Sequence, residues 1–166
     1  MPASPWVNQI QNFRERYEPW RRGLPVEITI IGSSGVGVFA DDQNLEDAIK
    51  AVDQLAAGEN PLSVHFSRRN SFPESNLYFF EPTEHSDLVR LQNKIVGTGL
   101  KFTKSPFPFT PHCTIADLGE NPSPEALTDL NSIAVPTDSI TIAALSFYGL
   151  VDRNCTLIHR SVFQKK

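Results

Sequence analysis

The sequence predicts a single domain of the α+β class. After an initial helix, its segments alternate in the order strand, helix, two strands, helix, strand, helix, two strands. Hairpin-like strand pairs mixed with helices favour α+β over a parallel, doubly wound sheet. The chain has 166 residues, of which 40% are hydrophobic and 20% charged, and no linker or low-complexity tract divides it. These values suit one globular domain, spanning residues 1–166, with a sizeable core.

The elements follow from periodicity and from the residues that end each segment. Apolar residues at steps of three and four predict an amphipathic helix over residues 6–20. A β-branched run at 26–31, stopped by a Gly-Ser segment, predicts a strand and then a loop. An apolar stripe ending at Gly58 predicts a helix over 44–57. The remaining predictions are strands at 62–67, 76–80, 112–116, 140–150 and 155–163, helices at 84–96 and 122–130, a loop at 68–75 and a turn at 151–154.

Composition excludes some classes of function. The formal net charge of -4 argues against a strongly basic protein that binds nucleic acid by neutralising many phosphates. No run approaches the roughly 18 apolar residues of a membrane helix, and the N-terminus has no apolar signal core. We therefore expect a cytoplasmic protein. Cys113 and Cys155 lie in apolar, strand-like runs without metal-ligand spacing, so we expect two buried free thiols and no metal.

The best candidate for chemistry is the triplet His112-Cys113-Thr114. Residues i and i+2 of a strand point to one face of the sheet, so His112 and Thr114 project together and Cys113 points away. An imidazole beside a hydroxyl can transfer a proton and hold a phosphate oxygen. Similar triplets begin at His65 and His159, so context decides: a proline precedes His112 and a small-apolar run follows it. The alternative is a histidine that a backbone partner satisfies at a strand end.

Residues 109–116, Phe-Thr-Pro-His-Cys-Thr-Ile-Ala, resemble the second signature of the 2H phosphoesterases. This superfamily includes the bacterial 2′-5′ RNA ligase-like proteins and cyclic nucleotide phosphodiesterases. Its first signature, a His-hydrophobic-Thr strand after a proline, normally lies some 80 residues earlier. The matching stretch here begins at Pro25 and contains Glu27-Ile28-Thr29, and Glu27 precedes His112 by 85 residues. Residues 13–19 also resemble the helix end that leads into that strand.

The resemblance implies two pseudo-symmetric lobes of antiparallel sheet, with flanking helices around a central cleft. It implies metal-independent chemistry without a cofactor, on a 2′,3′-cyclic phosphate or a 2′-5′ linkage of RNA or of a small nucleotide. By this comparison Thr29 and Thr114 bind the phosphate oxygens, and His112 is the general acid or base. The expected partner is an RNA end or a nucleotide, not a membrane, and the expected state is a monomer.

Two departures from the family pattern matter. Glu27 stands where the family has its first catalytic histidine, and two unit charges about 4 Å apart repel by about 4 kcal/mol at an effective dielectric near 20. Either Glu27 is the opposite proton carrier of an altered reaction, or the protein is a binding module for a nucleotide or RNA; a protein-interaction domain is a third reading. Residues 1–5 are also too short and proline-rich to form the first strand of the family, which we expect to be missing or truncated.

Other residues have a functional and a structural interpretation. His65 could enter the cleft in place of the missing histidine, or it could lie at the surface. Tyr78, like Phe72 and Tyr148, could stack on a base or pack in the core. Arg68 and Arg69 could contact phosphate or be solvated. Residues 33–37 are glycine-rich after a strand, but they lack the lysine and the spacing of a phosphate loop.

Overall fold

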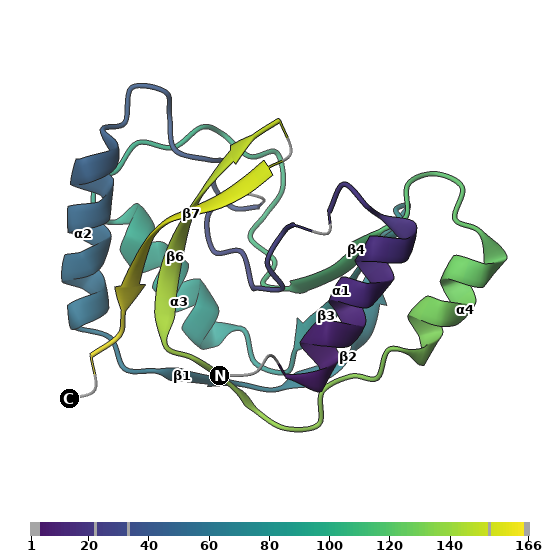
Figure 1. Cartoon of the computed structure of the whole chain (residues 1–166). Coiled ribbons are helices and arrows are strands. Elements are labelled where there is room, and N and C mark those ends of the chain that lie inside the picture. The colour runs from purple at the N-terminus through teal and green to yellow at the C-terminus, as the bar shows by residue number, and fades with distance from the viewer. Residues whose placement is uncertain (1–3, 22, 33, 153, 165–166) are drawn as a thin grey trace.

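The structure, a computed structural model, describes residues 4–21, 23–32, 34–152 and 154–164 (Figure 1). Its helices and antiparallel strands confirm the α+β class. The helices are α1 (Pro5–Tyr17), α2 (Leu45–Ala57), α3 (Ser86–Val96) and α4 (Pro124–Ser132). The strands are β1 (Leu62–Val64), β2 (Phe66–Ser71), β3 (Leu77–Pro82), β4 (Cys113–Asp117), β5 (Ile140–Ile142), β6 (Ala144–Val151) and β7 (Asn154–Val162).

The chain forms two lobes. In one lobe, β2, β3 and β4 form an antiparallel sheet in that order, and α1 packs against both β4 and α4. In the other, β6 and β7 form a long hairpin that α2 covers, and α3 packs against α2. The short pair of β1 and β5 runs along the base between the lobes, as Figure 1 shows. This arrangement is the two-lobed fold that the resemblance implies.

Local sequence signals explain where two helices begin. The Asn44 side chain accepts a hydrogen bond from the backbone N–H of Asp47 and so caps α2. The Ser123 hydroxyl accepts one from the backbone N–H of Ala126, and Pro124 occupies the first position of α4, where its missing N–H costs nothing.

The main core lies between α1, α3 and the three-stranded sheet. Ile10 of α1, Phe80 of β3, Leu91 of α3 and Ile115 of β4 are each completely buried there. A smaller cluster of Ala48, Val52 and Phe147 joins α2 to β6. The main core therefore joins α3 of one lobe to α1 and the sheet of the other, and such burial of apolar surface is the dominant stabilising contribution in folding.

Four predictions of local structure are wrong. Residues 26–31 form no regular strand, because only one bridge, between Ile28 and Cys113, pairs them with the rest of the protein. Arg68 and Arg69 are not in a loop, since β2 continues to Ser71 and pairs with β3. The strand predicted at 62–67 is divided into β1 and β2, and the one predicted at 140–150 into β5 and β6. In each case the two parts pair with different partners.

Candidate functional site

A single antiparallel bridge brings the two motifs together. Ile28, the centre of Glu27-Ile28-Thr29, pairs with Cys113, the centre of His112-Cys113-Thr114. Around such a pair the neighbours run in opposite order, so Glu27 is in register with Thr114, and Thr29 with His112. Two segments that are 85 residues apart in the sequence are thus adjacent in the fold.

A cleft of about 630 Å³ lies beside this bridge and reaches both lobes. Glu27, Thr29 and Thr114 line it, and Tyr148 and Arg160 contribute from β6 and β7. Among the groups that line it, the cleft therefore offers the Glu27 carboxylate, the hydroxyls of Thr29, Thr114 and Tyr148, and the Arg160 guanidinium. His112, in contrast, is only 6% exposed and does not line the cleft.

His112 lies immediately before β4 under two aromatic rings. Its ring centroid is 5.0 Å from that of Phe72 and 5.2 Å from that of Phe79. Its Nδ1 is 2.6 Å from the carbonyl oxygen of Thr110, which can only accept, so Nδ1 carries the proton and donates. Burial lowers the pKa of His112, against the smaller opposing effect of that hydrogen bond. The ring is consequently neutral at pH 7, with the lone pair on Nε2.

Glu27 is exposed and has a partner from the other lobe. The hydroxyl of Tyr148 donates to Glu27 Oε1 at 2.7 Å. Burial and this hydrogen bond raise the pKa of Tyr148 to about 12, so the phenol keeps its proton at neutral pH. Sequence reasoning considered Tyr148 for base stacking or core packing and missed this contact, because nothing in the sequence indicates that β6 passes Glu27.

The two thiols differ from each other in burial. Cys113 is buried, and burial raises its pKa to about 12, with a smaller contribution from the charge of Glu27. Cys155 is only partly buried, so the expectation of two buried thiols holds for Cys113 alone. Burial and the Glu27 charge also raise the pKa of Cys155. Both side chains are thiols rather than thiolates at neutral pH, and neither is poised as a nucleophile.

Residues 34–37 follow the first motif and form no phosphate loop. The backbone N–H of Gly35 donates to Phe107, and that of Gly37 donates to Thr103, both at backbone carbonyls. Gly35 has a positive φ of 78°, and a Cβ there would lie 2.6 Å from the amide of Gln92. Gly35 therefore allows close packing of the backbone against Gln92. Residue 33 of the predicted loop lies outside the described residues.

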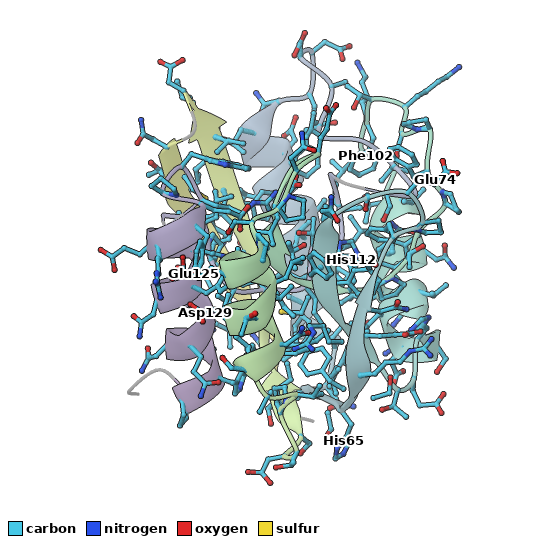
Figure 2. All side chains as sticks on the ribbon, turned by 90° about the vertical axis from the view of Figure 1, so that its right-hand side faces the viewer. His65, Glu74, Phe102, His112, Glu125 and Asp129 are labelled. Atoms are coloured by element: carbon cyan, nitrogen blue, oxygen red, sulfur yellow. The ribbon has the colours of Figure 1, made fainter. Side chains whose placement is uncertain are left out.

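His65 and Tyr78 lie away from the cleft. His65 is exposed between β1 and β2, and Figure 2 shows it at the lower edge of the molecule, well separated from His112. The Tyr78 ring packs against the main core, and its hydroxyl is 3.3 Å from Asn76 Oδ1. Neither residue lines the cleft that contains Glu27.

The remaining charged candidates have partners within the protein. Arg68 pairs with Glu81 at 2.7 Å, and Arg69 donates to the carbonyl oxygens of Leu130 and Ile133. Nε2 of His159 is 2.9 Å from Asp53 and joins β7 to α2. These contacts connect structural elements.

The described residues contain no group of three or more His, Cys, Asp and Glu side chains that could hold a metal ion. Within the same ranges, no helix is long and apolar enough to cross a membrane.

Comparison with known proteins gives consistent findings. Residues 1–149 match the 2′-5′ RNA ligase superfamily. A protein of Halalkalibacterium halodurans named "Putative phosphoesterase BH1439" is 29% identical over 129 residues, which are 77% of this chain and 71% of that protein. A protein of Bacillus cereus with a similar name is 27% identical over 115 residues, and the match spans 69% of this chain but just under two thirds of the relative, 64%.

Solved structures show the same fold. LigT of Escherichia coli complexed with 3′-AMP has a TM-score of 0.52 and 16% identity, over 96% of this chain and 92% of LigT. LigT complexed with NADP⁺ has a TM-score of 0.52 and 15% identity, over 98% and 93% of the two chains.

Proposed function

Because this chain belongs to the 2′-5′ RNA ligase superfamily, we propose that it is a 2H-type phosphodiesterase. Its substrate is a 2′,3′-cyclic phosphate or a 2′-5′ phosphodiester of RNA or of a nucleotide. The observation that carries the proposal is the bridge between Ile28 and Cys113, which unites the two motifs. The names of the relatives and the nucleotides bound by LigT support it.

In the proposed reaction, His112 is the general base. Its neutral ring has a free lone pair on Nε2, which takes a proton from the attacking water. The water oxygen bonds to phosphorus, the bond from phosphorus to the leaving ribose oxygen breaks, and that oxygen takes the proton of the Tyr148 hydroxyl. Solvent then removes the proton that His112 took and returns one to Tyr148. Thr29 and Thr114, which line the cleft, hold the phosphate oxygens. These steps use only groups of the protein and need no metal ion.

Glu27 is the proton carrier on the opposite side. A carboxylate cannot itself donate a proton, but the Tyr148 hydroxyl bonded to it keeps its proton at neutral pH. The pair therefore provides both an acceptor and a donor where other members have an imidazole. Because His112 is nearly buried, access to the phosphate also requires the half-buried Phe72 ring to move from above it.

The test is turnover of a 2′,3′-cyclic nucleotide by the His112→Ala protein. We expect the rate to fall about 10²–10⁴-fold, as is typical when an acid-base group is lost. His65→Ala is the matched control, because His65 is exposed and remote from the cleft, and it should leave the rate unchanged. A folded His112→Ala protein with the wild-type rate would exclude the assignment.

A second candidate function is nucleotide binding without chemistry. It is favoured by the exposed carboxylate of Glu27 on the cleft wall, which repels an anionic phosphate by about 4 kcal/mol at 4 Å and an effective dielectric near 20. In this case 3′-AMP binds to the wild type, but no cyclic nucleotide is turned over. Replacing Glu27 by His would then create cyclic phosphodiesterase activity. Measurable wild-type turnover would exclude this candidate.

A further inference from the structure

One buried side chain is shared by the two motif segments. Arg14 of α1 is only 1% exposed. Its Nε donates to the carbonyl oxygen of Ile115 at 2.8 Å, and Nη2 donates to that of Thr114 at 2.6 Å. Its Nη1 donates to the carbonyl oxygens of Leu24 and Pro25 at 3.0 and 3.3 Å. The guanidinium therefore spans the gap between β4 and the segment that carries Glu27.

These contacts are unusual for a buried cation. Burial lowers the pKa of Arg14, and the nearby charge of Arg21 lowers it further, yet every hydrogen bond described above goes to a neutral carbonyl. Removing a charge from water is costly unless hydrogen bonds compensate for it. The planar fork of arginine is the side chain that can satisfy carbonyls on two segments at once. A lysine, with a single nitrogen, cannot reproduce this geometry.

We propose that Arg14 is a positioning residue that sets the separation of the two half-sites. Pro25 lies two residues before Glu27, and Thr114 is itself a proposed phosphate ligand. Only the bridge at Ile28 pairs the backbone of the first segment with β4, and Gln11, which also donates to the carbonyl oxygen of Leu24, makes no such link to β4. The effect of Arg14 on turnover rests on the proposed function, whereas its effect on the backbone of the two segments does not.

Two neighbouring residues provide matched comparisons. Nε2 of buried Gln92 donates to the carbonyl oxygens of Ile30 and Ser34, so it holds the far end of the first segment without touching β4. Buried Glu18, also from the α1 end, accepts from the backbone N–H of Asp117 and holds β4 without touching the first segment. Arg14 is placed differently, because it bonds to both.

The experiment compares Arg14→Lys with Glu18→Gln in the full chain. Hydrogen–deuterium exchange reports on the backbone without any need for activity. In Arg14→Lys we expect exchange to accelerate at least tenfold in residues 24–29 and 113–116, and to stay unchanged in α2, β6 and β7. In Glu18→Gln, whose amide oxygen can still accept from Asp117, residues 24–29 should exchange as in the wild type. Equal acceleration throughout the protein, or none in these segments, would overturn the proposal.

Turnover of a 2′,3′-cyclic nucleotide supplies the second measurement. We expect Arg14→Lys to lower kcat at least tenfold while KM changes less than threefold, because displaced half-sites still bind phosphate but no longer align the reacting groups. An unchanged kcat in a folded Arg14→Lys protein would refute the catalytic part. If the wild type itself turns over no substrate, the proposed function fails, and exchange alone decides the role of Arg14.

Discussion

The two half-sites of the proposed centre are held in different ways. His112 and Thr114 lie at the start of β4, which pairs along its length with β3 and has Ile115 completely buried behind it. Glu27 and Thr29 are exposed on a segment that has one bridge and no regular strand pairing. Buried side chains of Arg14 and Gln92 bond to the backbone of this segment instead.

This difference indicates that the backbone of the second half-site is more rigid than that of the first. A strand within a sheet opens only when much of its lobe unfolds, whereas a segment with few backbone hydrogen bonds opens locally. The unusual residue, Glu27, is on the weakly held side, and its hydroxyl partner Tyr148 comes from the other lobe.

The largest expected effect is the difference in unfolding free energy lost when an isoleucine is truncated in each half-site. Ile115→Ala should lower the free energy of unfolding by about 2–5 kcal/mol, because it leaves a cavity at a fully buried position. Ile28→Ala, at a half-buried position, should lower it by about 1 kcal/mol. Urea unfolding of both variants measures the two effects. Equal losses would mean that the first segment is as firmly packed as β4.

The second prediction concerns pH and His112. Burial lowers the pKa of His112 below the 6.5 of a free histidine, so its contribution to stability is complete above pH 6.5 and is lost as the pH falls through the folded-state pKa. Urea unfolding at pH 7.5 and pH 5 should show a larger loss for the wild type than for His112→Gln, which has no ionisable group there. If the two proteins lose the same stability, His112 is not buried in its neutral form.

The turnover rate should respond to pH in the same direction. A general base must be unprotonated, so kcat/KM should fall as the pH drops through a value below 6.5, tenfold per unit well below it. A rate that instead rises on acidification would indicate that His112 acts as the acid, with Glu27 as the base.

The sequence predicted the second half-site better than the first. Residues 112–116 alternate polar and apolar side chains at the start, and β3 pairs with them, so local pattern and long-range pairing agree. β4 begins within one residue of the prediction. The β-branched run at 26–31 has the same local pattern, but the structure provides it with a single bridge. Strand propensity measures fit to a pleated surface and does not show whether a partner strand exists.

Other contacts were beyond sequence reasoning for a related reason. The bonds from Arg14 to Thr114 and Ile115 join residues about a hundred positions apart, and they involve backbone carbonyls, which leave no residue-specific pattern. The contact between Tyr148 and Glu27 likewise depends on how the lobes meet. The caps at Asn44 and Ser123, in contrast, are local signals, because donor and acceptor are only three residues apart in the sequence.

A further prediction tests the link between the half-sites and the β6–β7 lobe. Tyr148→Phe removes the hydroxyl that donates to Glu27 and leaves the carboxylate with less compensation for its charge. One such hydrogen bond contributes about 1 kcal/mol, so the Kd of 3′-AMP should rise about fivefold. Isothermal titration calorimetry measures this change. Tyr78→Phe is the control, because the Tyr78 hydroxyl lies near Asn76 and away from the cleft. If Tyr148→Phe binds 3′-AMP as tightly as the wild type, the Tyr148 hydroxyl does not contribute to nucleotide binding.

The smallest effect should come from the second arginine on α1. Arg16 lies two positions after Arg14, but its side chain is exposed and pairs with Glu125 and with Asp129 of α4, whose side chains Figure 2 labels. Exposed ion pairs contribute about 0–1 kcal/mol, and salt screens them. Arg16→Ala should therefore change the free energy of unfolding by less than about 1 kcal/mol, and the difference should disappear in 1 M NaCl by the same screening. Exchange in residues 24–29 should also match the wild type. Should Arg16→Ala accelerate that exchange as much as Arg14→Lys does, the half-sites would depend on how α1 docks as a whole, and not on the four carbonyls that Arg14 binds.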